Sequence, residues 1–253
     1  MEFILIKHHH LESTNAEAHR LYQSGKAENG MVIIAEEQSN GKGHGDNAWE
    51  SEPGKNLTFS ILFKPVFIEP ARQFAITQII SLSLWEVLDS ILRKKKVTIK
   101  WPNDIYVGDK KIAGVLIQNF IKANSIDLSV IGVGLNVSQK HFFSDAPNPT
   151  SIILESGMEC PHDNLLEDIL ETFAQYIERF TTPSSFTALT KSYLEKLYRI
   201  DGNAIYKDKN GLFSATISGI SEYGHLLLTD NQGVQRSYGF KEVEFVNNSG
   251  KIN

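Results

Sequence analysis

The sequence contains little cysteine, no surplus of positive charge and no long apolar run. Cys160 is the only cysteine among the 253 residues, so the chain can form neither an internal disulfide nor a cysteine-based zinc site. Its 25 Lys and Arg residues against 30 Asp and Glu residues give a net charge of −5, which disfavours general binding of nucleic-acid phosphates. The N-terminus, MEFILIKHHH, lacks a signal peptide's apolar core, and no uninterrupted apolar run has the length of a bilayer span. We expect a cytoplasmic protein that binds neither DNA nor a membrane.

Hydrophobic residues make up 41% of the chain and charged residues 22%, values typical of a globular protein with a sizeable core. Apolar patterning predicts strands at 3–7, 31–38, 57–63, 97–101, 111–120 and 128–137, and helices at 13–25, 70–93, 163–180 and 185–197. After Ile200, short strands alternate with glycine-containing turns, which indicates a small barrel of five or six strands.

The stretch KWPNDIYVGDKKIAGVLIQ, at residues 100–118, has the strongest chemical signal. A proline ends the first strand, so Asn103 and Asp104 emerge at its tip, and a hairpin turn then brings Lys111 to the start of the next strand. Gly114 lies inside that second strand, where a glycine often marks close approach of a ligand or of another backbone. A lysine, a carboxylate and an amide therefore converge at one edge of a sheet. The alternative is a surface hairpin with an exposed Lys-Asp pair.

The consecutive histidines His8, His9 and His10 do not form a predicted metal site. In a strand their side chains point to alternate faces, so they cannot all bind one ion. His8 and His10 share a face, but the sequence shows no third ligand nearby. We assign no metal ligand in this chain and expect a solvated strand end.

Five ordered motifs resemble those of biotin protein ligases, the biotin–[acetyl-CoA-carboxylase] ligases. They are KWPND with KIAGVL (100–104 and 111–116), ESTN (12–15), Gln38 with GKG and Trp49 (38–49), PGKNL (53–57) and GVGLNV (132–137). The barrel-like tail after Ile200 also resembles the family's C-terminal domain, so the resemblance covers essentially the whole chain. The resemblance implies an α+β fold, in which a mixed β-sheet catalytic domain at 1–198 precedes a small SH3-like β-barrel domain at 199–253. It also implies that helices 70–93 and 163–180 cover the face opposite the active site, and that the barrel lies on the nucleotide side. The STN motif starts at residue 13, so we expect this protein to lack the winged-helix DNA-binding domain of the family's repressors.

The resemblance implies a two-step reaction that uses biotin, ATP and Mg²⁺. The biotin carboxylate attacks the α-phosphate of ATP to give biotinyl-5′-AMP and pyrophosphate, and a lysine of a biotin carboxyl carrier domain then takes the biotin. Cationic groups must offset the repulsion between two anions in the first step. The catalytic residues so implied are Lys111, Asp104 and Lys100. The biotin-binding residues are Ser13, Thr14, Gln38, Gly41, Lys42, Gly114 and Leu116, and the nucleotide-binding residues are Gly43, His44, Trp49, Asn103 and Asn136.

Several of these residues have a simpler structural interpretation. Ser13 or Thr14 could serve only as a helix N-cap. Trp49 could be a core anchor, Gln38 could satisfy a backbone group at a strand end, and Asn136 could brace the loop after its strand. The joint pattern, and not any single residue, favours the functional roles.

The loop GKGHGD, at residues 41–46, departs from the family's Gly-Arg-Gly-Xaa-Arg-Gly pattern. Lys42 keeps a charge but lacks the two-pronged guanidinium, Gly45 replaces the second basic residue, and Asp46 replaces the last glycine. The histidine at the fourth position is mostly neutral at pH 7. We predict that the loop meets the adenylate phosphate but holds biotinyl-AMP more loosely than in the family, with leakage of the reactive adenylate onto nearby lysines.

Two other functions stay open at this stage. A lipoate or octanoate ligase shares the fold and the adenylation step, but its pocket must take an apolar acyl chain, which the polar Ser13, Thr14 and Gln38 disfavour. A non-catalytic protein that binds biotin or its adenylate is the second alternative. Family members use a sheet edge for homodimers, and the same edge is available for the acceptor; the sequence does not decide between monomer and dimer.

Overall fold

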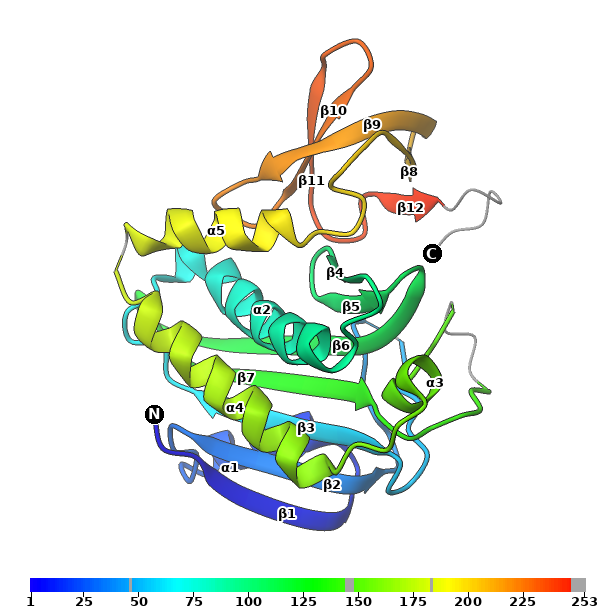
Figure 1. Cartoon of the computed structure of the whole chain (residues 1–253). Helices are drawn as coiled ribbons and strands as arrows, with labels where there is room; N and C mark the ends of the chain where they lie inside the picture. The colour runs from blue at the N-terminus through cyan, green and yellow to red at the C-terminus, as the bar shows by residue number, and fades with distance from the viewer. Residues whose placement is uncertain (46, 144–147, 183, 247–253) are drawn as a thin grey trace.

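The computed structural model describes residues 1–45, 47–143, 148–182 and 184–246. Its central feature is a sheet of seven strands in the order β1-β2-β3-β7-β6-β5-β4, in which β1 and β2 run parallel and all other neighbours antiparallel (Figure 1). The strands are β1 (Ile4–Leu11), β2 (Met31–Gln38), β3 (Asn56–Phe63), β4 (Val97–Lys100), β5 (Asp104–Val107), β6 (Lys110–Lys122) and β7 (Ser125–Asn136). The mixed sheet confirms the fold class expected from sequence.

One face of the sheet is covered by helices, which lie in front of it in Figure 1. The helical segments of the chain are α1 (Thr14–Gln23), η1 (Pro70–Arg72), α2 (Phe74–Ile91), α3 (Ile152–Ser156), α4 (His162–Arg179) and α5 (Ser185–Glu195). Helix α2 contacts β4, β5, β6 and the helices α4 and α5, and α4 also contacts β3. The large hydrophobic core lies between these helices and the sheet, and includes Phe59, Ile79, Ile131 and Phe173. The predicted helices at 70–93 and 163–180 therefore cover one face, as expected.

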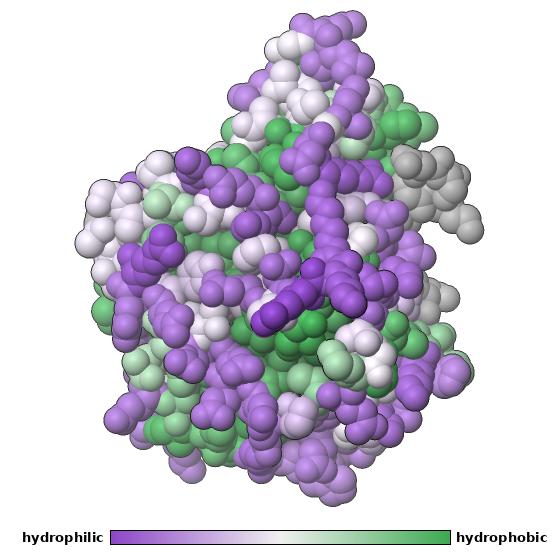
Figure 2. Space-filling model, viewed as in Figure 1, coloured by the Kyte–Doolittle hydropathy of each residue, from purple (hydrophilic) through white to green (hydrophobic). Residues whose placement is uncertain are grey.

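Residues 70–91 have the length and apolar character of a membrane span. Their environment is that of a core helix, because 61% of the most apolar 18-residue stretch is buried inside the fold. Hydrophilic residues are spread over the outer surface of the helical face (Figure 2), as expected of helices whose apolar sides face a sheet.

The C-terminal part forms a second, antiparallel sheet of five strands, in the order β11-β10-β9-β8-β12. Its strands are β8 (Ala204–Asp208), β9 (Gly211–Ile220), β10 (Leu226–Asp230), β11 (Gln235–Tyr238) and β12 (Glu244–Val246). The glycine-containing turns expected from sequence separate these strands, at Asn210-Gly211, Tyr223-Gly224 and Asn231-Gln232-Gly233. The two sheets meet where the Trp101 indole N–H donates to the Gly224 carbonyl at 2.9 Å.

The second face of the large sheet is only partly covered. Helix α1 packs there on a small cluster that includes Ala18, Ile33, Leu62 and Val130. Because strand side chains alternate between faces, the same strands that send Phe59 and Ile131 to the main core present polar residues and glycines to the second face. The uncovered part of that face holds the cavity described next.

Candidate active site

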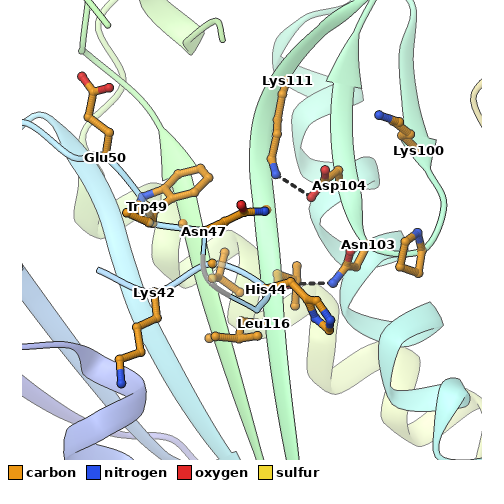
Figure 3. Close-up of a pocket in the computed structure, with 18 of the residues that line it drawn as sticks. Lys42, His44, Asn47, Trp49, Glu50, Lys100, Asn103, Asp104, Lys111 and Leu116 are labelled. Atoms are coloured by element: carbon orange, nitrogen blue, oxygen red, sulfur yellow. Dashed lines mark hydrogen bonds and ion pairs between the residues drawn. The ribbon is translucent and has the colours of Figure 1, made fainter. Parts of the chain in front are cut away.

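A cavity of about 980 Å³ lies on the second face of the sheet, between the start of α1, the ends of β4–β7 and the C-terminal domain. All the site residues predicted from sequence, except Gly41, line it. These residues come from segments far apart in the sequence, and ten of the residues that line the cavity are labelled in Figure 3. The fold therefore brings together the separate motifs of the sequence.

At the centre of the cavity, Lys111 Nζ lies 2.7 Å from Asp104 Oδ1 (Figure 3). Strands β4, β5 and β6 form consecutive antiparallel hairpins, and the register pairs Asp104 with both Lys100 and Gly114. Each of the two side chains is 26% exposed. This is a half-buried pair inside a cavity, and not the exposed surface pair that was the alternative from sequence.

The Lys111 backbone is held on both sides. Its N–H donates to the Asn148 carbonyl at 2.8 Å, and its carbonyl accepts from the Thr150 N–H at 2.8 Å. The Asn136 Nδ2 in turn donates to the Thr150 carbonyl at 2.9 Å, so Asn136 braces this segment. The buried Asn136 Oδ1, however, has no partner among the described residues. Such an acceptor at a cavity wall is suited to a ligand donor or a cation.

Lys100 occupies a more buried position beside this pair. Its Nζ lies 5.1 Å from the Tyr106 ring centroid and 5.5 Å from that of Phe245, which comes from the C-terminal domain. Burial lowers the pKa of Lys100 to about 8; Asp104 works against this shift, and Lys111 adds to it. Lys100 is therefore mostly, but not entirely, a cation near neutral pH.

The inner end of the cavity is a buried polar cluster. Ser60 Oγ lies 2.7 Å from both Thr14 Oγ1 and Asn15 Oδ1, and the Thr14 backbone N–H donates to Gln38 Oε1 at 2.8 Å. Ser13 is the N-cap residue of α1, but its hydroxyl makes no capping hydrogen bond. Ser13 thus has the N-cap position considered from sequence but not the capping hydrogen bond, and Gln38 accepts from the backbone at this helix start, as its structural alternative had it.

Two glycines on β7 and one on β6 make the floor of the cavity. A Cβ on Gly132 would overlap the Asn15 amide, and a Cβ on Gly134 would overlap the Trp49 ring. At Gly114 a Cβ would come within 3.1 Å of Lys111 Nζ and 3.3 Å of Trp49. The space left by Gly114 is thus shared by Lys111 and Trp49. The Trp49 Nε1 is buried and has no partner among the described residues.

The loop over the cavity closes on itself. The Gly43 N–H donates to the Asn47 carbonyl at 2.7 Å, and the Trp49 N–H donates to the Gly41 carbonyl at 2.9 Å. In Figure 3 Lys42, which is exposed, points away from the Lys111–Asp104 pair. Burial and the nearby Lys241 lower the pKa of His44, consistent with the neutral histidine expected from sequence. The substitution at Asp46 lies outside the described residues.

Sequence reasoning missed several residues of the cavity. Asn15 and Ser60 complete the inner cluster. The alternation of Asn56, Thr58 and Ser60 in an otherwise apolar strand is a sequence signal that could have identified Ser60. Phe240, Lys241 and Phe245 enter from the C-terminal domain. Asn103, predicted to bind nucleotide, donates through Nδ2 to the Val115 carbonyl at 2.5 Å and so also braces β6.

Comparison with known proteins is consistent with this geometry. The sequence model of the Biotin/lipoate A/B protein ligase family matches residues 9–136, about half of the chain. The Bifunctional ligase/repressor BirA of Bacillus subtilis (strain 168) is 28% identical over 242 residues, which are 92% of this chain and 72% of that protein. The Biotin--[acetyl-CoA-carboxylase] ligase of Paracoccus denitrificans is 24% identical over 231 residues, 88% of this chain and 93% of that protein.

Among solved structures, the biotin protein ligase from Aquifex aeolicus in complex with biotin and ATP superposes with a TM-score of 0.77. It is 24% identical, and the match covers 94% of this chain and 97% of that chain. This likeness confirms the α+β fold with its C-terminal sheet.

Proposed function

The chain belongs to the Biotin/lipoate A/B protein ligase family, and we propose that it is an ATP-dependent biotin protein ligase that forms biotinyl-5′-AMP and transfers the biotin to a carrier-domain lysine. The relatives named above support biotin as the acid. The observation that carries the proposal is the position of the Lys111–Asp104 pair in the cavity. On one side of it lies a buried polar cluster suited to a small neutral ring, and on the other lie cationic and aromatic groups suited to a nucleotide.

Biotin binds with its ureido ring at the inner cluster. The ring offers both N–H donors and a carbonyl acceptor, and Ser13, Thr14 and Gln38 offer hydroxyls and an amide. Buried polar groups of this kind reject analogues that leave them unpaired. The valeryl chain then runs past Leu116 along the glycine floor, so that its carboxylate reaches Lys111.

In the first step, a carboxylate oxygen of biotin attacks the α-phosphorus of MgATP, and the bond from that phosphorus to the bridging oxygen of pyrophosphate breaks. Lys111 holds both anions with one compact positive charge, which can follow the reacting oxygens as they change partners. Lys100 adds positive charge on the same side. The Mg²⁺ that arrives with ATP needs few protein ligands, and the unpartnered Asn136 Oδ1 and the Asp104 carboxylate are suitable oxygens for it or for its waters.

In the second step, the lysine amine of the acceptor attacks the carbonyl carbon of the mixed anhydride, the bond from that carbon to the phosphate oxygen breaks, and AMP leaves. Asp104 is placed to receive the proton from the attacking amine, because it lies beside the lysine that touches the same carboxyl group.

A biotin carboxyl carrier domain is the acceptor we propose, and it docks on the free edge of β6. Strand β5 pairs only with residues 110–114 of this 13-residue strand. The remainder, up to Lys122, has no strand partner on that side among the described residues, and such an edge accepts an added strand. A homodimer through the same edge would compete with the acceptor.

We place the boundary between the catalytic domain and the C-terminal domain between residues 198 and 199.

The test is pyrophosphate release from MgATP by the purified protein, with and without biotin, beside a Lys111→Ala variant. Biotin-dependent release that falls at least about 1000-fold in the variant is expected, because an electrostatic contact to the reacting oxygens is lost. Biotin binding without pyrophosphate release by the unaltered protein would favour the non-catalytic alternative. Faster release with lipoate or octanoate than with biotin would favour the other branch of the family.

A further inference from the structure

The turn that joins β11 to β12 reaches into the active-site cavity from the C-terminal domain. This turn, residues 239–242, is closed by the Glu242 N–H, which donates to the Gly239 carbonyl at 3.1 Å, and by the Gly239 N–H, which donates to Glu242 Oε2 at 2.6 Å. Phe240 packs on His44 with ring centroids 4.1 Å apart, and on Trp101 at 6.2 Å. The turn is therefore anchored to the loop over the cavity and to the KWPND segment.

Lys241 holds an unusual backbone conformation in this turn. Its φ is +66°, in the left-handed region that a side chain makes unfavourable and that favours glycine. A lysine here costs conformational energy, so a requirement for its side chain would explain its presence.

The Lys241 side chain runs to the loop over the cavity. A Cβ on Gly45 would lie 2.7 Å from Lys241 Nζ, so the glycine leaves the space that the ammonium occupies. The same charge helps to keep His44 neutral, since it lowers the pKa of that ring after burial has done so. No ion pair or hydrogen bond joins the Lys241 ammonium to any residue that the structure describes.

A cation at this outer end of the cavity would complement the charge of a bound nucleotide. A nucleotide polyphosphate brings several negative charges, while Lys42, the loop's own cation, points away from the Lys111–Asp104 pair (Figure 3). We propose that Lys241 binds a phosphate of the bound nucleotide, so that the C-terminal domain supplies the charge that the loop does not deliver. This inference rests on the proposed function, in that the nucleotide is the ATP of the adenylation step.

The test is calorimetric titration with the Mg²⁺ complex of α,β-methylene-ATP in saturating biotin, because this analogue cannot release pyrophosphate and binding is measured without reaction. Lys241→Gly removes the charge but suits the positive φ, Lys241→Arg keeps the charge, and Lys209→Ala is the control, an exposed lysine in another turn of the same domain. We expect Lys241→Gly to bind the analogue about tenfold more weakly, with unchanged biotin affinity and no fall in Tm. Lys241→Arg and Lys209→Ala should bind it like the unaltered protein.

An analogue affinity within twofold of the unaltered protein in Lys241→Gly would overturn the inference, because a merely structural lysine at this φ is replaced by glycine without loss. A failed pyrophosphate assay with intact, Lys241-dependent analogue binding would count against the ligase activity and not against this contact. Absence of analogue binding by the unaltered protein would overturn both.

Discussion

The two ends of the cavity are built in different ways. The inner end is part of the sheet and of α1, and its side chains Thr14, Asn15 and Ser60 are almost fully buried and hydrogen-bonded to one another. The outer end consists of the loop at 41–49 and the turn at 239–242, where His44 and Lys42 are exposed. Its contacts are an edge-to-face pair of rings, His44 and Phe240, and a few backbone hydrogen bonds.

This difference separates recognition of the acid from retention of the nucleotide. Groups fixed by packing and by neighbouring hydrogen bonds hold a ligand in one geometry, whereas a loop adapts to it. We therefore expect changes at the inner end to decide whether biotin binds at all. Changes at the outer end should alter nucleotide affinity and the lifetime of the adenylate. Lys42 and Gly45, two departures of this chain from the family's loop pattern, lie at the outer end.

Replacement of Gly132 by alanine should have the largest effect, because it breaks the rigid inner end. The new Cβ would overlap the Asn15 amide, which is hydrogen-bonded to Ser60. We expect biotin affinity to fall at least about 100-fold, and overpacking to lower the free energy of unfolding by about 1–3 kcal/mol. Calorimetry with biotin and thermal unfolding measure the two effects.

The matched control is Gly219→Ala, also in a strand, where a Cβ meets only Leu227 Cδ1 at 3.5 Å, an ordinary contact. It should leave biotin affinity unchanged. A Gly132→Ala protein that binds biotin as well as this control would show that the inner end is as adaptable as the outer one.

The titration of Lys100 should have a smaller effect on ligand binding than Gly132→Ala. A rise in pH should stabilise the fold and weaken the binding of ATP. The pKa of Lys100 falls from 10.5 to about 8 in the folded protein, so between these values the unfolded chain holds a proton that the folded chain has released. Stability therefore rises with pH through this window, by about 3 kcal/mol in total. Binding of ATP should weaken several-fold over the same window, since a cation beside the nucleotide is lost.

The measurement is the unfolding free energy and the ATP affinity at pH 7.5 and 9.5, beside Lys100→Met. The variant should lack this part of the pH dependence in both quantities. Parallel pH slopes in the two proteins would mean that Lys100 keeps an ordinary pKa.

Much of the inner end could be predicted from sequence. The apolar run at 31–38 predicted β2 as observed, and the turn residues 107–110 predicted the hairpin that brings Lys111 beside Asp104. Strand β5 (Asp104–Val107) was not among the predicted strands. Ser60 was not predicted as a site residue, because the apolar residues of β3 outnumber its alternating polar ones. Only the packing of α1 on that face of the sheet shows which residues Ser60 contacts.

The outer end could be predicted less well, for a physical reason. Phe240 and Lys241 lie about 200 residues after the loop that they contact, in a turn with no motif, and no local rule gives a contact between two domains.

The first strand is longer than the sequence predicted. The prediction ended it at residue 7, whereas β1 extends through the histidines to Leu11. Its exposed His9 is paired with Glu36 at 2.9 Å, a partner that strand pairing reveals and sequence spacing does not.

The smallest effect is expected within the loop itself, where Lys42→Arg should lengthen the lifetime of bound biotinyl-AMP about threefold. A guanidinium can hold a phosphate with two hydrogen bonds where an ammonium acts as a point charge. The gain is small because the side chain at position 42 is exposed and points away from the Lys111–Asp104 pair, so the longer arginine reaches the phosphate only part of the time. Dissociation of radiolabelled adenylate into excess unlabelled biotin and MgATP measures it, with Lys64→Arg, another exposed lysine, as the control. Biotin affinity should stay constant, since the inner end is untouched. If the unaltered protein already releases its adenylate as slowly as a Gly-Arg-Gly homologue, the loop's departures cost nothing in retention, and the outer end is better organised than its contacts indicate.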